Sequence, residues 1–475
     1  RNWFMIAELK KQGCYLNISL YDHMGSARPD SHPRRIGLLL LTEEAKTRFR
    51  ENAKTILDTV NPYTGTKLKE DPQLIGVEFS NEEEGCILWP NLKATKVGKK
   101  EYALFDLKFR EFLKRKYKTL TALNNAWKTN YASFEAVNVP RGLLSGSAKD
   151  SPKSRDFIDC CTELQTAMME FCTRTVREIG YRGLIGQFDV PVWFGDNAVR
   201  YSHSQIALGH SYWSHAIMLN LYKQRDSVRG SGAATMQSSL ETSALYWRNL
   251  VAGKFADRPF FVTETNHCIP NPYSYEFGLL MGGYSAFQDF SAILPHCQPV
   301  HLKTERQAPF EIGSNPVARA SNILLYVLFK RGDVTPSRHN ISLQVGPDLI
   351  KRFQPFSPEQ TKLALMTGFS LEFPGRKRPE GVRKDVPRDL AIPATRTDGL
   401  YKPELDDAIG AGSGKDRIFS ADNCAELLRK RGILPKNNRS NPKRGIYQTD
   451  NGELTLYANR KKLELRTPRT QGACL

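Results

Sequence analysis

The chain has 475 residues, and its 68 Lys and Arg against 50 Asp and Glu give a formal net charge of +18. Its pI is about 9.4 and its mean hydropathy is −0.47. No apolar run approaches the roughly 20 residues that span a bilayer, so no membrane span is expected. This length accommodates one large domain and a smaller one.

The positive charge has three interpretations: an ordinary solvated surface, a substrate that is an acidic glycan, or nucleic-acid binding. Zinc-finger spacing, an RNP-like motif and a basic helix with heptads are all absent from the sequence, so no nucleic-acid partner is expected. The nine cysteines are odd in number and include no C-x-x-C pair, which excludes a structural zinc site and a disulfide framework of the small secreted type.

Strand-like apolar runs alternate with amphipathic helical stretches along the first two thirds of the chain. The predicted strands are 14–22, 74–80, 184–190, 205–213, 259–265 and 290–297. The predicted helices are 2–12, 42–60, 105–128, 156–179, 274–289 and 316–330. Such alternation predicts parallel strands joined by helical crossovers.

Six predicted strands are two short of a closed (β/α)₈ barrel. We therefore expect an α/β fold of the (β/α)₈ TIM-barrel type over residues 1–332, N-terminally incomplete, whose first two strands lie upstream of residue 1. A six-stranded open α/β sheet is the structural alternative.

The pattern changes after residue 332, where short runs alternate with period two. Residues 333–475 are expected to form a β-rich domain, a C-terminal β-sandwich with a long basic loop over about 374–444. Asn451-Gly452 lies between two such runs and predicts a hairpin.

Two glutamates each follow an apolar strand where it meets a polar loop: Glu82 in LIGVEFSNEEE and Glu264 in RPFFVTETNHC. The carboxyl ends of barrel strands carry the catalytic groups of such folds. Two facing carboxylates are the minimum equipment for cleaving a glycosidic bond. Taken singly, a glutamate at a strand end is more often a surface charge, and the acidic run at 82–84 is most simply a solvated loop.

Several segments, in the right order, resemble glycoside hydrolases of clan A, that is, family 5-like and related bacterial retaining β-glycosidases with a C-terminal β-sandwich. DPQLIGVEFSNEEE resembles the segment of the fourth barrel strand, GHSYW the end of strand six, and PFFVTETN the nucleophile segment of strand seven. TLTALNNAWKTNYASFEAV and GELTLYANRKKLELRTPRTQGA are also similar to segments of these enzymes.

The resemblance implies a role for each matching residue. Glu82 would be the acid/base and Glu264 the nucleophile. Asn81 would bind the sugar 2-hydroxyl, Tyr212 would donate to Glu264, and His210 would line the floor of the site.

The chain departs from the clan at the eighth strand, where SAILPHC lacks the usual Trp. His296 is expected to occupy part of the position that this Trp has in the clan. The position of three further residues after strands makes them candidates for sugar binding: Asp22, His23 and Trp193.

These expectations predict a retaining glycoside hydrolase that cleaves O-glycosidic bonds of a poly- or oligosaccharide, acidic or neutral, by double displacement. Neither a cofactor nor a metal is expected. The alternative is a non-catalytic carbohydrate-binding barrel. A metal-dependent barrel hydrolase is a second and less favoured alternative. The expected location is secreted or periplasmic, with any signal peptide outside this sequence.

Overall fold

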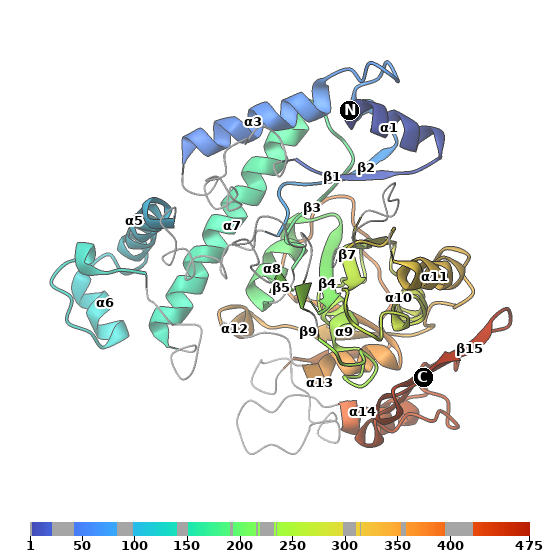
Figure 1. Ribbon diagram of the computed structural model, residues 1–475. Helices are drawn as coiled ribbons and strands as arrows, with labels where there is room; N and C mark the ends of the chain where they lie inside the picture. Colours follow the sequence, from blue (N-terminus) through green and yellow to red (C-terminus); the bar gives the residue numbers. More distant parts are fainter. Residues whose placement is uncertain are drawn as a thin grey trace.

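The computed structural model describes most of the chain (Figure 1). The described residues are 2–20, 42–82, 98–139, 151–190, 193–214, 217–218, 232–233, 235–297, 310–313, 315–352, 358–394 and 421–475.

Six parallel strands form the centre of the first two thirds of the chain. They are β1 (Leu16–Ser19), β2 (Leu74–Glu78), β3 (Leu184–Gly186), β4 (Ala207–Trp213), β7 (Phe260–His267) and β8 (Ala292–Pro295). They pair in the orders β1-β2-β3 and β4-β7-β8. A backbone hydrogen bond also joins β3 to the start of β4: Ile206 N, directly before β4, donates to Ile185 O at 3.1 Å. All six predicted strands are confirmed, and they lie side by side in chain order.

Helices connect and cover these strands. They are α1 (Asn2–Lys11), α3 (Glu43–Asp58), α5 (Gly98–Tyr117), α6 (Leu120–Trp127), α7 (Pro152–Ile179), α8 (Phe194–His203), α9 (Leu245–Val251), α10 (Glu276–Phe287) and α11 (Pro316–Leu325). Shorter elements are η2 (Leu68–Glu70), η3 (Phe134–Ala136), β5 (Ile217–Met218), β6 (Gly232–Ala233) and the π-helical turn η5 (Tyr326–Lys330). None of the described helices is both long and apolar enough to cross a bilayer.

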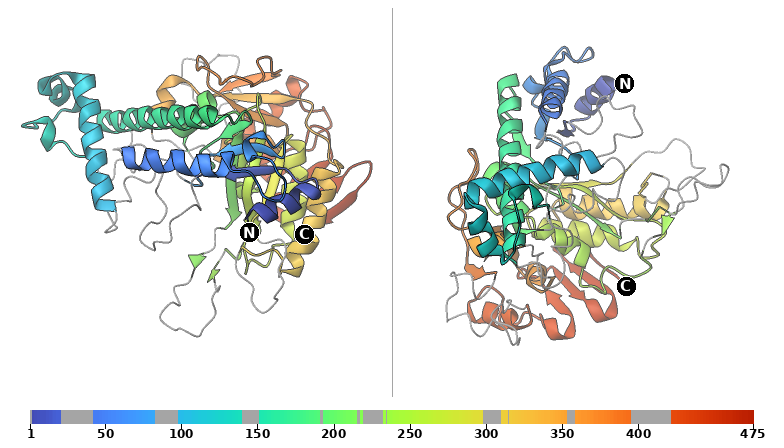
Figure 2. Two further views of the ribbon diagram at one scale, coloured as in Figure 1. Left: turned by 90° about the horizontal axis from the view of Figure 1, so that it is seen from above. Right: turned by 90° about the vertical axis from the view of Figure 1, so that its left-hand side faces the viewer.

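The single helix predicted over 105–128 is two helices. Lys118 adopts a left-handed φ of 60°, and the Thr119 hydroxyl then caps α6 by accepting from Ala122 N at 3.2 Å. This cap satisfies an amide that the helix start leaves free. Figure 2 shows α5 and α6 at the far end of the long α7, away from the central strands.

Apolar side chains from neighbouring strands meet on one face of the strand array. Ile206, Leu208 and Phe261 are buried there, and Ile75, Leu184 and Ala292 pack against them. They come from, or directly precede, five of the six strands. Inward-facing layers of this kind fill the interior of a closed barrel.

The C-terminal part differs from the expected sandwich. Strands β9 (Asn340–Gln344), β10 (Gly368–Glu372) and β11 (Leu390–Pro393) form a parallel sheet in the order β10-β9-β11. The connection from β9 to β10 contains the short helices α12 (Pro347–Ile350), α13 (Pro358–Thr361) and η6 (Lys362–Leu365). The physical reason is burial on both faces: three successive residues of β9 and four of β10 are buried, which is typical of parallel strands.

A separate antiparallel sheet follows. It contains β12 (Ile446–Gln448), β13 (Leu454–Tyr457), β14 (Lys462–Arg466) and β15 (Gln471–Cys474) in chain order. The hairpin expected at Asn451-Gly452 joins β12 and β13, with Gly452 at a φ of 76°. Shorter helices around it are α14 (Ala421–Lys430), η8 (Pro442–Arg444) and η9 (Ala458–Arg460).

The loop expected over 374–444 therefore contains a strand, β11, and a helix, α14; residues 395–420 lie outside the described part. The hydrophobic core is continuous across the expected boundary at 332. Leu280 and Phe287 of α10 belong to the same buried cluster as Ile341 of β9 and Leu454 of β13.

Candidate active site

The turn that carries Glu82 is held by the segment after β3. Gln187 accepts from Phe79 N at 2.9 Å and from Ser80 N at 3.0 Å, and its amide donates to Ser80 O at 2.8 Å. Gln187 is fully buried, so water does not compete for these bonds. The end of β2 is thereby fixed to the end of β3.

The backbone of Glu82 is held by a second buried residue. Glu82 N donates to both carboxylate oxygens of Asp189, at 3.0 and 3.2 Å. Glu82 has a φ of 51°, a left-handed conformation that is costly for a residue with a side chain. The bond to Asp189 therefore stabilises the backbone geometry from which the Glu82 side chain extends.

Glu264 lies opposite, on β7. The register of β4 against β7 pairs His210 with Glu264. The Tyr212 hydroxyl donates to Glu264 Oε2, and His296 Nδ1 lies 3.7 Å from the same oxygen. Glu264 is thus surrounded by groups from β4 and from the end of β8.

His210 lies between the two glutamates and is buried. Its Nδ1 is 3.1 Å from Glu82 Oε1 and 3.9 Å from Glu264 Oε2. Its Nε2 is 3.4 Å from Asp189 Oδ2, at ion-pair distance although not aligned for a hydrogen bond. One atom each of Glu82, His210 and Glu264 lie within 4.8 Å of one another.

The electrostatics of this cluster favour protonated groups. Burial alone would lower the pKa of His210, but the carboxylates of Asp189, Glu82, Glu264 and Glu78 raise it to about 10. Burial, and then the charge and hydrogen bond of Glu264, raise the pKa of Tyr212 well above its usual value. His210 is therefore cationic at neutral pH, and Tyr212 remains a hydrogen-bond donor.

A group of aromatic rings lies beside Glu264. The Phe310 ring lies 5.0 Å from that of Tyr212 and 5.7 Å from that of His296, both edge-on. Asn266 donates to His296 O at 2.7 Å and to Phe310 O at 3.1 Å. Apolar ring faces next to a carboxylate suit the apolar face of a sugar.

Of the residues predicted from sequence, the structure brings five together: Glu82, Glu264, His210, Tyr212 and His296. Asn81 directly precedes Glu82 and is half-buried.

Trp193 lies elsewhere: it precedes α8 and packs against the apolar cluster of α5, α6 and α7. Asp22 and His23 lie outside the described residues.

Four residues of the site were missed from sequence: Gln187, Asp189, Asn266 and Phe310. The first two do carry a signal, since they are polar residues in the otherwise apolar run LIGQFDV. Asn266 follows Glu264 on the same strand, and Phe310 comes from a segment without a recognisable motif.

Glu82, His210 and Glu264 are also the set of side chains that could offer ligand atoms to a metal ion, within the part of the chain that the structure describes. A metal needs the neutral imidazole. Because the pKa of His210 is raised to about 10, a proton competes strongly for that nitrogen at neutral pH. The arrangement fits proton transfer better than metal binding.

Two facing glutamates, one after β2 and one on β7 with β3 and β4 between these strands, match the arrangement that the resemblance to clan A glycoside hydrolases implies. The chain belongs to glycoside hydrolase family 42 of this clan: the family model, described as beta-galactosidase, matches residues 27–270, about half of the chain. The match confirms the resemblance to clan A, and this family is one of glycosidases. Comparison with curated proteins gives no significant match.

Comparison with solved structures finds glycosidases of three bacteria. The cold-adapted beta-galactosidase from Rahnella sp. R3 is 13% identical with a TM-score of 0.48, over 82% of this chain and 58% of that enzyme. The beta-galactosidase from Bacillus circulans sp. alkalophilus is 15% identical with a TM-score of 0.41, over 77% of this chain and 52% of that enzyme. The exo-carrageenase GH42 from Bacteroides ovatus is 14% identical with a TM-score of 0.42, over 78% of this chain and 51% of that enzyme. The chain thus spans between half and three fifths of the length of these enzymes.

Proposed function

We propose that the protein is a retaining glycosidase in which Glu264 is the nucleophile and Glu82 the acid/base. The observation that carries the proposal is the closeness of the two carboxylates, which reach within 4.8 Å of one another on either side of His210. Retaining enzymes hold their carboxyl groups about 5–5.5 Å apart, whereas inverting enzymes need about 6.5–9.5 Å to admit a water molecule.

The surroundings of the two glutamates suit different roles. The Glu264 side chain is 18% exposed and accepts from Tyr212, which orients one oxygen and leaves the other for attack on the anomeric carbon. The Glu82 side chain is 41% exposed, so it can reach both a leaving group and an incoming water molecule. Glu82 gives its proton to the glycosidic oxygen as the Glu264–sugar bond forms. It then takes a proton from water as that bond breaks.

The substrate class follows from the family: we propose a β-linked galactoside at the end of, or within, a poly- or oligosaccharide. Asn81 is proposed to bind its 2-hydroxyl. Among the described groups that act on His210, the carboxylates of Glu78, Glu82, Asp189 and Glu264 outnumber the cation of His210 itself, so an acidic group next to the cleaved bond would be repelled. Any acidic substituent of the substrate is therefore expected on a sugar further from the cleaved bond.

We also propose that β1, β2, β3, β4, β7 and β8 are strands three to eight of a (β/α)₈ barrel. Their chain order, their parallel pairing and the apolar layer of Ile206, Leu208 and Phe261 support this assignment. Glu82 then follows strand four, and Glu264 lies on strand seven.

The proposal is tested by hydrolysis of aryl β-galactosides by the wild type and three variants. Glu264→Ala should abolish turnover, because no covalent intermediate can form. Glu82→Ala should lose about 10²–10⁴-fold in rate. Added azide should partly restore it, because a small anion can attack the intermediate without base assistance.

The matched control is Glu241→Ala, which removes an exposed carboxylate that pairs with Lys461 at 3.3 Å and, within the described part of the chain, makes no hydrogen bond or ion pair with the cluster. Its rate should equal that of the wild type. Near-normal turnover by Glu264→Ala would refute the assignment. Galactoside binding without hydrolysis by the wild type would instead support a carbohydrate-binding protein, and loss of activity with a chelator would support the metal-dependent alternative.

A further inference from the structure

A buried carboxylate that is neither the proposed nucleophile nor the proposed acid/base contacts both members of the Glu82–His210 pair. Asp189 is 1% exposed in its side chain. It accepts from the Glu82 backbone, and it lies 3.4 Å from the far nitrogen of His210. A charged group at such a depth is retained at a large cost in desolvation, which is offset here by these two partners.

An acid catalyst must hold a proton at the working pH. Burial alone cannot secure one on Glu82, because its side chain is 41% exposed. His210 Nδ1 and Glu82 Oε1 are 3.1 Å apart and can share one proton, so they titrate as a pair. Negative charge around this pair increases its affinity for the shared proton.

We propose that Asp189 is a positioning residue for the acid/base: it fixes the Glu82 backbone and, through His210, keeps one transferable proton on the Glu82–His210 pair at neutral pH. The proposal rests on the function proposed above. The proton leaves the pair for the glycosidic oxygen in the first step and is regained from water in the second, so the proton balance of the reaction closes.

The groups that face His210 come from every strand packed against it. Glu78 is on β2, Glu82 follows β2, Asp189 follows β3, and Glu264 is on β7. His296, at the end of β8, lies 3.7 Å from Glu264. Asp189 differs from Glu82 and Glu264 because it has no chemical step of its own, so its charge can be removed without removing a reacting group.

Asp189→Asn is the decisive variant, because the amide oxygen can still accept from Glu82 N while the charge is lost. We expect the alkaline limb of the pH profile of kcat/KM to move down by about 1 unit or more, since a neighbouring opposite charge shifts a pKa by about 1–3 units. Glu276→Gln is the matched control: Glu276 is a fully buried carboxylate that accepts from Ser238 and Ser239, and its variant should keep the wild-type profile.

A second measurement does not depend on activity. NMR of ¹⁵N-labelled histidine, with His210→Asn to identify the signal, should show His210 as an imidazolium at pH 8 in the wild type. Its midpoint should fall by about 1 unit or more in Asp189→Asn. A neutral His210 at pH 8 in the wild type would overturn the proposal even if Asp189→Asn failed to fold.

An unchanged midpoint and alkaline limb in a folded Asp189→Asn would overturn it as well. If Glu264→Ala and Glu82→Ala kept full activity, the proposed function would fail. The NMR titration would then still report whether Asp189 holds the proton on His210.

Discussion

At the scale of single residues, the cluster around His210 combines side chains that strands place with one, Asp189, that turns place. Glu82, His210 and Glu264 each lie on or just after a strand, and parallel strands bring such positions together. The role of Asp189 depends instead on left-handed backbone at two residues, Glu82 at a φ of 51° and Phe188 at 61°. Neither is glycine, so no local rule predicts these turns.

Trp193 was predicted to bind sugar from its position after a strand, but that position does not distinguish sugar binding from packing. A tryptophan after a strand is equally suited to stack on a sugar or to pack in an apolar cluster. The helices α5, α6 and α7 supply such a cluster. Most of its residues are far from Trp193 in the sequence, so local sequence patterns do not predict the contact.

Tyr212 provides a test at this scale. Tyr212→Phe removes the hydroxyl that donates to Glu264 Oε2 while keeping the ring against Phe310. Hydrogen bonds to charged groups contribute about 1.5–3 kcal/mol, which corresponds to about a 10–100-fold loss in kcat. Thermal unfolding should change little. Steady-state kinetics on an aryl β-galactoside measures the loss, and a kcat within twofold of the wild type would show that Glu264 is oriented by other groups.

At the scale of elements, the strands were easier to predict than their surroundings. Each of the six central strands is a short apolar run, whereas α9 has only seven residues and shows no clear period. The sheet of β9, β10 and β11 was mistaken for part of a sandwich. Short apolar runs such as ISLQV fit a strand of either direction, and the direction is decided by the connections.

The contact between α10 and α11 depends on glycines of α10, and Gly278 makes the closest approach. A side chain at Gly278 would overlap the carbonyl oxygen of Ser321 on α11, and Gly278 N donates to the Ser321 hydroxyl at 2.6 Å. The backbones of the two helices can approach this closely only because position 278 has no Cβ.

Gly278→Ala should therefore push the two helices apart and lower the free energy of unfolding by about 1–3 kcal/mol, the usual cost of overpacking. The gain in helix propensity from Gly to Ala, about 1 kcal/mol, is too small to compensate fully. Urea unfolding followed by circular dichroism measures the change. Gly472→Ala in β15 is the control, because a Cβ there meets nothing within 4 Å, and its stability should be close to that of the wild type. Equal stabilities for the two variants would contradict the close approach.

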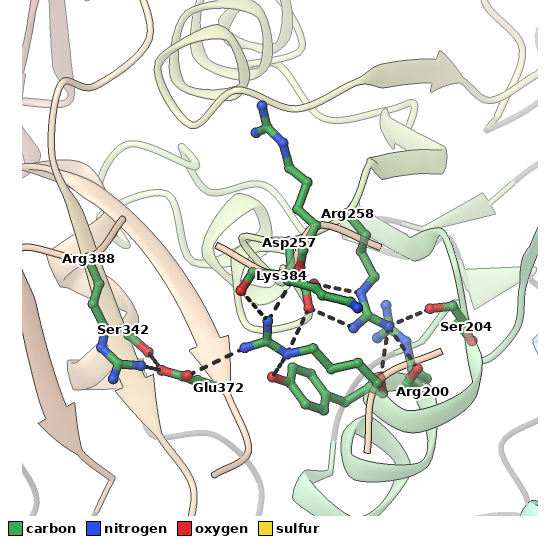
Figure 3. Close-up of polar contacts among 11 residues, drawn as sticks. Arg200, Ser204, Asp257, Arg258, Ser342, Glu372, Lys384 and Arg388 are labelled. Atoms are coloured by element: carbon green, nitrogen blue, oxygen red, sulfur yellow. Dashed lines mark hydrogen bonds and ion pairs between the residues drawn. The ribbon is translucent and has the colours of Figure 1, made fainter. Parts of the chain in front are cut away.

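At the scale of the whole molecule, one ion-pair network joins the C-terminal parallel sheet to α8 and to the segment between α9 and β7 (Figure 3). Arg378 lies at its middle. Its Nε contacts the Tyr201 hydroxyl at 2.9 Å and Asp257 at 3.4 Å, and its other end lies 3.7 Å from Glu372 of β10. Glu372 also accepts from Arg388, and the whole group lines a polar cavity of about 530 Å³. The charge of Arg378 thus helps to hold two parts of the chain together, while Arg388 pairs with Glu372 within the C-terminal part.

The network predicts how the segment around Arg378 responds to mutation. Arg378→Ala would leave Asp257, which is buried, and Glu372 with one partner fewer, and it would also remove the donor to the carbonyl oxygen of Lys384. We expect a loss of about 1–3 kcal/mol in unfolding free energy. Because the segment would detach first, cleavage by trypsin within 376–388 should become faster while the central strands stay protected.

The neighbouring Lys377 is exposed, so Lys377→Ala is the matched control and should keep the wild-type stability. Lys377→Ala also removes one trypsin site, whereas Arg378 precedes Pro379 and is not a trypsin site, so cleavage is compared at the bonds after Arg383, Lys384 and Arg388, which both variants keep. Mass spectrometry of the limited digest identifies the cleaved bonds. If Arg378→Ala were cut no faster than Lys377→Ala, apolar packing such as that of Phe255 against Phe373, at 6.2 Å between ring centroids, would be what holds the sheet in place.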